Sequence, residues 1–214
     1  MNLIERLHES FVKSRRVRTL AAAIARLIPA NATVLDVGSG DGLLAETVLR
    51  TRPDVRFRGV DVLVRPQARI PVTPFDGTRL PFPAESFDVV LFADVLHHTS
   101  HAEALLRDAR AVARQAVIIK DHCADGFLAW PTLRFMDHVG NARFGVALPH
   151  LYRRWKEWQA LFGRLEMTVT SIQRRLALYP PPLTWIFDRS LHFIVVIVRT
   201  DAAAKLPRTL EVAV

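Results

Sequence analysis

The stretch Val34-Leu35-Asp36-Val37-Gly38-Ser39-Gly40-Asp41-Gly42, residues 34–42, decides the fold. A short apolar run leads directly into three alternating glycines, and the apolar residues of 43–49 lie on one helical face. Glycine lets the backbone turn tightly and approach a ligand closely, because no Cβ stands in the way. A helix that begins behind such a loop presents free N–H groups. The stretch therefore predicts a strand, a ligand-binding loop and a helix.

The same alternation of strand and helix patterns continues along the chain. Strands are expected at Thr33–Val37, Val55–Val60, Arg69–Phe75, Phe87–Phe92, Ala116–Lys120, Leu165–Ser171 and His192–Val198. Helices are expected at Leu20–Leu27, Leu43–Leu49, Leu151–Phe162 and behind a capping box formed by Ser100 and Glu103. Residues 122–149 are expected to be irregular. Strands that alternate with helices indicate βαβ units, so the sequence predicts an α/β fold with a parallel sheet.

Composition limits the classes of protein that remain. The chain has 214 residues, half of them hydrophobic, and no linker or repeat, so we expect one domain over 1–200 and a tail over 201–214. The single cysteine, Cys123, excludes an internal disulfide framework and a four-cysteine zinc site. There is no apolar run long enough for a membrane span, and the charged first residues do not resemble a secretory signal. We expect a cytoplasmic monomer or homodimer.

The net charge of +8 raises the question of an acidic partner. Basic residues occur in separate groups, around 15–18, 50–69 and 153–175, and no stretch is densely basic. A nucleic-acid partner is therefore not favoured, while contact with a membrane surface stays open.

The glycine loop has two readings. A dinucleotide-binding fingerprint would need a third glycine at position 43, where Leu43 stands. It would also place the Asp36 carboxylate close to a pyrophosphate, which it would repel. A carboxylate at this position suits a cation instead, and S-adenosyl-L-methionine (SAM) carries an ammonium and a sulfonium but no phosphate.

Asp36-x-Gly38-x-Gly40-x-Gly42 after an apolar strand resembles motif I of class I SAM-dependent methyltransferases. Asp61 ends the next strand, Asp76-Gly77 precedes the fourth strand, and the segment 94–98 resembles the loop after that strand in the small-molecule type 11 branch. This resemblance implies a Rossmann-like, seven-stranded, mostly parallel sheet with helices on both faces and an antiparallel last strand. It implies that SAM is held by Asp36, Gly38, Ser39, Gly40, Asp61, Val62, Asp76, Gly77 and Ala93.

The resemblance also bears on the acceptor. The family's Asn/Asp-Pro-Pro-Tyr/Phe motif, which marks methylation of amide or base nitrogens, does not follow the fourth strand. We therefore expect O- or C-methylation of a small, apolar or aromatic acceptor. An RNA methyltransferase, suggested by the charge, and a non-catalytic SAM-binding protein are the alternatives.

Methyl transfer from a sulfonium needs mainly alignment, with a base where the acceptor must lose a proton. His98, then His97 and His122, are the candidate catalytic residues, because they follow strands four and five. No metal site is expected, since there is no H-E-x-x-H motif. Asp121 and His122 with Asp137 and His138 are the alternative that could converge on a cation. Residues 122–149 carry several aromatic side chains and are expected to cover the acceptor.

Overall fold

The computed structural model describes residues 14–141 and 149–199, which contain one seven-stranded sheet in the order β3-β2-β1-β4-β5-β7-β6. The strands are β1 Thr33–Val37, β2 Arg56–Asp61, β3 Val72–Pro74, β4 Phe87–Ala93, β5 Ala113–His122, β6 Met167–Gln173 and β7 His192–Arg199. The first five are parallel, and β7 runs antiparallel to both of its neighbours. The predicted fold class is confirmed.

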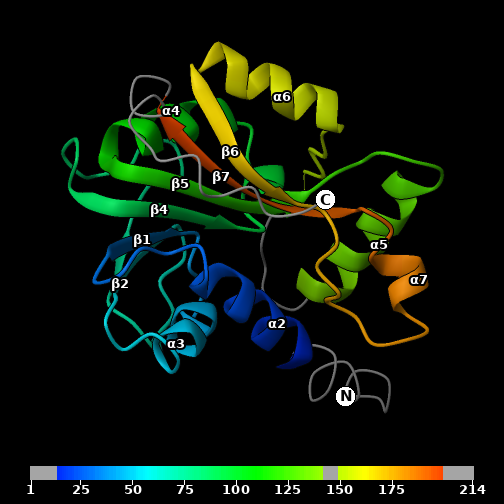
Figure 1. The fold of residues 1–214 in the computed structure, drawn as a ribbon, viewed down its shortest axis with the longest axis horizontal. Helices are drawn as coiled ribbons and strands as arrows, with labels where there is room; N and C mark the ends of the chain where they lie inside the picture. The colour runs from blue at the N-terminus through cyan, green and yellow to red at the C-terminus, as the bar shows by residue number, and fades with distance from the viewer. Residues whose placement is uncertain (1–13, 142–148, 200–214) are drawn as a thin grey trace.

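The helices cover both faces of this sheet (Figure 1). They are α2 Ser14–Ala25, α3 Leu43–Leu49, the 3-10 helix η2 Leu96–His98, α4 Ala102–Val112, α5 Ala129–Asn141, α6 Trp155–Arg164 and α7 Thr184–Phe187. One apolar core packs α2, α3 and α5 on one face, and a second packs α4 and α6 on the other. Strand β4 is buried on both sides, as expected of a central parallel strand. None of the described helices is long and apolar enough to cross a bilayer.

The prediction that 122–149 is irregular is wrong, because helix α5 occupies much of it. Pro131 disguises this helix in the sequence, but it is the third helical residue, and proline is tolerated in a first turn where the N–H groups have no helical partner. The described part of this segment therefore gives a rigid element beside the strand ends. Phe144, one of its aromatic residues, lies outside the described residues.

Several predicted boundaries also move. Ser100 and Glu103 do not form a capping box: α4 begins after His101, whose N–H donates to Thr99 Oγ1 at 3.0 Å. Helix α6 begins at 155 rather than 151, because Glu157 accepts the Arg154 N–H at 2.6 Å. Strand β3 is reduced to three residues, whereas β5 extends by three residues at its start and two at its end. Helix α2 begins at 14 and ends two residues before the predicted end.

Candidate functional site

The glycine loop is fixed between the carboxyl ends of β1 and β2. The N–H of Gly38 donates to the Val60 carbonyl at 2.8 Å, and the N–H of Gly40 donates to Asp61 Oδ2 at 2.8 Å. The other oxygen of Asp61 accepts the Leu63 N–H at 2.9 Å. One carboxylate therefore holds the glycine loop and the first turn after β2 in register.

Two of the glycines have different reasons to be glycine. Both have left-handed backbones, with φ of 72° at Gly38 and 59° at Gly40. A Cβ on Gly38 would lie 2.6 Å from Val95 Cγ2, so this position is required for packing between two loops. A Cβ on Gly40 would meet no atom within 4 Å. The backbone at Gly40 therefore faces open space that a ligand can approach.

Asp36, at the end of β1, is a buried carboxylate that lacks a full set of partners. Its side chain is 2% exposed, and within the described part of the chain Oδ2 has no hydrogen-bond partner. Burial, with a smaller effect of the nearby Asp61 charge, raises the pKa of Asp36 to about 7. Such a group beside an open loop is suited to a cationic ligand, as the sequence predicts.

We expect Asp36→Asn to stabilise the ligand-free protein above pH 7. An unfolded aspartate titrates near a pKa of about 3.9, so between about pH 4 and pH 7 the folded wild type holds a proton that the unfolded chain has lost. Wild-type stability therefore falls as the pH rises through this window. The gain in the variant should be about 4 kcal/mol at pH 8, because the folded pKa is about three units higher than the unfolded one, and it should disappear near pH 4. Thermal unfolding of both proteins across this range is the measurement, and a gain that does not depend on pH would contradict the raised pKa.

The remaining predicted cofactor residues lie on the next loops of the same sheet edge. Val62 is 64% exposed and follows β2, and a Cβ on Gly77 would lie 3.0 Å from its Cγ1, so the two loops are in contact. The Asp76 carboxylate accepts the N–H groups of Thr78 and Arg79 and fixes the second loop. Ala93 ends β4 beside the loop that packs on Gly38.

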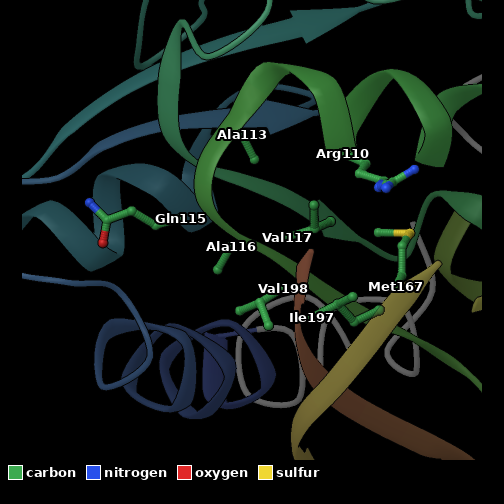
Figure 2. A pocket seen from close by; sticks show the side chains of 8 residues that line it. All are labelled: Arg110, Ala113, Gln115, Ala116, Val117, Met167, Ile197 and Val198. Atoms are coloured by element: carbon green, nitrogen blue, oxygen red, sulfur yellow. The ribbon is translucent and has the colours of Figure 1, made fainter. Parts of the chain in front are cut away.

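Two hollows lie elsewhere. Figure 2 shows one near the amino end of β5, lined by Ala113, Gln115 and Ala116, with a volume of about 10 Å³, which is room for about one water molecule. The other has a volume of about 370 Å³ and lies between α4 and α6, where Glu103 and Arg164 line it. Neither hollow is lined by the glycine loop, so we do not assign the ligand to them.

The three predicted catalytic histidines come together at the carboxyl ends of β4 and β5. The ring of His97 lies 3.9 Å from that of His98 and 4.5 Å from that of His122, between ring centroids. His97 donates from Nδ1 to Asp121 at 2.5 Å, and its Nε2 lies 3.4 Å from Asp137 of α5. We call these five residues, His97, His98, Asp121, His122 and Asp137, the histidine cluster. His138 of α5 is exposed and lies outside it.

A partly buried ion group adjoins the cluster and connects α2 to the sheet. Lys120 of β5 is fully buried and pairs with Asp94, which follows β4. Asp94 also pairs with Arg16 of α2 at 2.6 Å. Burial alone would raise the pKa of Asp94, but Lys120 and Arg16 hold it well below its usual range. The amino-terminal helix is thus held by charge at the strand ends.

The histidines differ in their electrostatic environment. Burial opposes protonation of His97, yet Asp121 and Asp137 raise its pKa to about 9. Burial and the neighbouring His97 lower the pKa of His98 to about 4. Burial, followed by His97 and Lys120, also lowers the pKa of His122. At neutral pH His97 is therefore a cation between two carboxylates, while His98 and His122 are neutral.

The sequence model of a known family, described as a methyltransferase domain, matches residues 11–178 of this chain. The chain belongs to the methyltransferase domain family. The match covers most of the chain and includes the glycine loop, β2, β4 and the histidine cluster. A search of curated protein sequences finds no match to this methyltransferase.

Solved structures resemble the methyltransferase in fold. The complex of the Haloferax volcanii Trm112 methyltransferase activator with a methyltransferase matches 92% of this chain and 98% of the other, with 14% identity and a TM-score of 0.64. The mitomycin 7-O-methyltransferase MmcR matches 91% of this chain and 60% of its own, with 22% identity and a TM-score of 0.61. A Burkholderia thailandensis 1,6-didemethyltoxoflavin-N1-methyltransferase, with bound 1,6-didemethyltoxoflavin and S-adenosylhomocysteine, matches 86% of this chain and 77% of its own, with 20% identity and a TM-score of 0.60. At these identities, the structural likeness shows the fold alone.

The family and the fold together confirm a class I methyltransferase that uses SAM as its methyl donor. The residues at the glycine loop fit that group. Gly40 leaves its backbone open, and the buried Asp36 carboxylate has an unpaired oxygen among the described residues. The exposed apolar side chains of Val62 and Leu63 offer a surface for a flat base. The individual contacts remain predictions of the resemblance.

Some polar residues of the site are not evident from the sequence. Tyr152 donates its hydroxyl to Asp137, and His192, the first residue of β7, packs its ring 4.9 Å from that of His122. Neither belongs to a recognisable motif. The pairing of His122 with His192 follows from the antiparallel register of β5 and β7, which the sequence does not reveal. The one available signal in the sequence was His192 itself, a polar residue at the start of a largely apolar strand.

Proposed function

We propose that this methyltransferase methylates a small, apolar or aromatic acceptor, at oxygen or carbon, at the carboxyl ends of β4 and β5. The observation that carries the proposal is that these strand ends are covered. Helix α2 reaches over them through Arg16, and α5 is joined to the chain before α6 by the Asp137–Tyr152 hydrogen bond. A covered site that buries charged groups favours a small acceptor over a long polymer.

In the proposed arrangement the site has a donor half, which binds SAM, and an acceptor half, which binds the molecule to be methylated. When bound, SAM supplies a methyl group whose sulfonium leaving group is already activated. Asp36, Asp61 and the glycine loop hold the donor, and the histidine cluster faces the acceptor. Of the three candidate catalytic histidines, His98 is the one whose side chain is partly exposed, so it is best placed to contact an acceptor. His97 is enclosed between Asp121 and Asp137 and acts as a positioning residue.

The proposed cover contains large apolar residues of two kinds. Met136 of α5 is buried in the core, whereas Trp130 and Phe135 are 46% and 57% exposed. The Trp130 ring lies 5.3 Å from that of Tyr152, which in turn stacks 5.6 Å from His97. Trp130 therefore continues the histidine cluster outwards and is the aromatic side chain that we assign to the acceptor.

We expect Trp130→Ala to raise the acceptor KM at least about fivefold while SAM affinity stays the same. The variant loses apolar contact with the acceptor, which contributes about 1 kcal/mol or more of binding free energy. Phe135→Ala is the matched control: it is on the same helix and similarly exposed, but it packs on Phe187 of α7. It should leave KM nearly unchanged. Steady-state kinetics with titration calorimetry for SAM separate the two effects. Equal changes of KM in both variants would remove Trp130 from the acceptor site.

The proposed function is tested by incubating the purified protein with methyl-labelled SAM and a cell extract, and then separating small molecules from RNA. We expect the label in an apolar small-molecule fraction, which mass spectrometry can identify. Label in RNA would establish the first alternative. SAM binding without transfer to any fraction would establish the second, a non-catalytic binding protein.

The RNA alternative rests on the net charge of +8. Several surface arginines already pair with carboxylates and are less free to contact phosphates: Arg107 and Arg164 both pair with Glu103, and Arg52 pairs with Asp54. We therefore expect weak RNA binding. A steep fall in RNA affinity with increasing salt would instead indicate many phosphate contacts and favour this alternative.

A further inference from the structure

His97 has the orientation of a metal-binding histidine. It donates from Nδ1 to the buried Asp121 carboxylate at 2.5 Å, so Nε2 is turned away from Asp121. In metal sites, a carboxylate that binds one ring nitrogen fixes the imidazole and increases the basicity of the other nitrogen. The side chain is 1% exposed, and Nε2 has no hydrogen-bond partner in the described ranges.

Asp137 and His98 offer two further donor atoms beside His97. Asp137 Oδ2 lies 3.4 Å away, and His98 Nδ1 is also buried without a partner among residues 14–141 and 149–199. Ligand atoms of these three residues all lie within 4.8 Å of one another. Two ligands on one tetrahedral zinc ion, each about 2.0–2.1 Å from it, stand about 3.3 Å apart. The spacing of His97 and Asp137 is therefore that of two ligands on one ion.

The local backbone explains how adjacent histidines share one site. His97 and His98 lie on η2, and successive side chains on a 3-10 helix are about 120° apart rather than opposite. Asp137 comes from α5 and is itself oriented by the Tyr152 hydroxyl and by His122, whose Nε2 lies 3.6 Å from Oδ1. Two of the three ligands are therefore held by further residues: Asp121 orients His97, and Tyr152 and His122 orient Asp137.

We propose that His97 Nε2, His98 Nδ1 and Asp137 bind one divalent transition-metal ion beside the acceptor, and that the ion displaces the proton on His97 Nε2, which is released to solvent. Two imidazoles and one carboxylate suit Zn²⁺ and its first-row neighbours better than Mg²⁺ or Ca²⁺. The three ligands leave coordination positions for water or for an oxygen of the acceptor. This proposal differs from the expectation, drawn from the sequence, that the chain has no metal site. The three ligands belong to this chain, so binding of the ion does not depend on the proposed class of acceptor.

Titration calorimetry of the untagged full-length protein, freed of metal with EDTA and titrated with ZnSO₄, tests the site. We expect one equivalent of Zn²⁺ to bind. His98→Gln and Asp137→Asn should each weaken this binding at least about tenfold. His101→Gln is the matched control, because His101 is exposed and lies three residues beyond His98. It should bind as the wild type does.

Two further measurements keep the outcome independent of activity and of folding. Co²⁺ in place of Zn²⁺ should give a visible absorption spectrum that changes in His98→Gln and not in His101→Gln. Should Asp137→Asn unfold, His98→Gln decides, because the His98 side chain is partly exposed. Failure of the wild type to bind one equivalent, or equal Zn²⁺ affinity in His98→Gln and His101→Gln, would overturn the proposal.

Discussion

Replacing Gly40 with valine is expected to lower SAM affinity more than about a hundredfold while the domain stays folded. The added side chain would occupy the open space in front of the Gly40 backbone, where no described atom lies within 4 Å of a Cβ. The left-handed backbone of Gly40 adds strain of about 1–2 kcal/mol, which a domain of this size tolerates. Titration calorimetry with SAM and thermal unfolding measure the two effects separately.

Gly126→Val is the matched control for Gly40→Val. Gly126 also has a left-handed backbone, with φ of 99°, and also faces open space, but it lies between β5 and α5, away from the glycine loop. Its valine variant should show a similar loss of stability and normal SAM affinity. Retention of SAM binding by Gly40→Val would show that the open space is not the donor site.

Much of the fold was predictable, because parallel strands have a strong local signal. The predicted bounds of β1 and α3 are confirmed residue for residue, since the glycine loop between them ends the strand and begins the helix. Helix α5 was missed because proline and glycine usually interrupt a helix. The sequence does not reveal that Pro131 lies in the first turn of this helix and Gly140 in its last turn, where both are tolerated. The start of α4 was misplaced because Thr99, one residue before Ser100, accepts the N–H at this turn.

The candidate site was predictable in its donor half and only partly in its acceptor half. Asp36, Gly40 and Asp61 lie in consecutive loops after parallel strands, and the carboxyl ends of such strands meet at one edge. The cluster around His97 depends instead on α5, which brings Asp137 from forty residues further along the chain. No spacing rule relates those two residues, because helix α4, strand β5 and the connection 123–128 separate them. Sequence reasoning could name the histidines and, in an alternative cation site, Asp121 and Asp137, but it could not place those two carboxylates on either side of His97.

Replacing Asp61 with alanine is expected to weaken SAM binding by about 2 kcal/mol or more, which is about thirtyfold. The Asp61 carboxylate holds the N–H groups of Gly40 and Leu63, so its loss releases the glycine loop as well as the expected contacts to the ribose hydroxyls. Calorimetry at pH 8 is the suitable measurement, because the charge of Asp61 contributes to the raised pKa of Asp36, and Asp36 is mostly ionised there in either protein.

Asp54→Ala is the control, since Asp54 likewise accepts a backbone N–H but at a turn away from the glycine loop. It should lower stability and leave SAM affinity unchanged. An Asp61→Ala protein that is folded and binds SAM normally would mean that β2 does not carry the donor, and the assignment of the donor half would have to be abandoned.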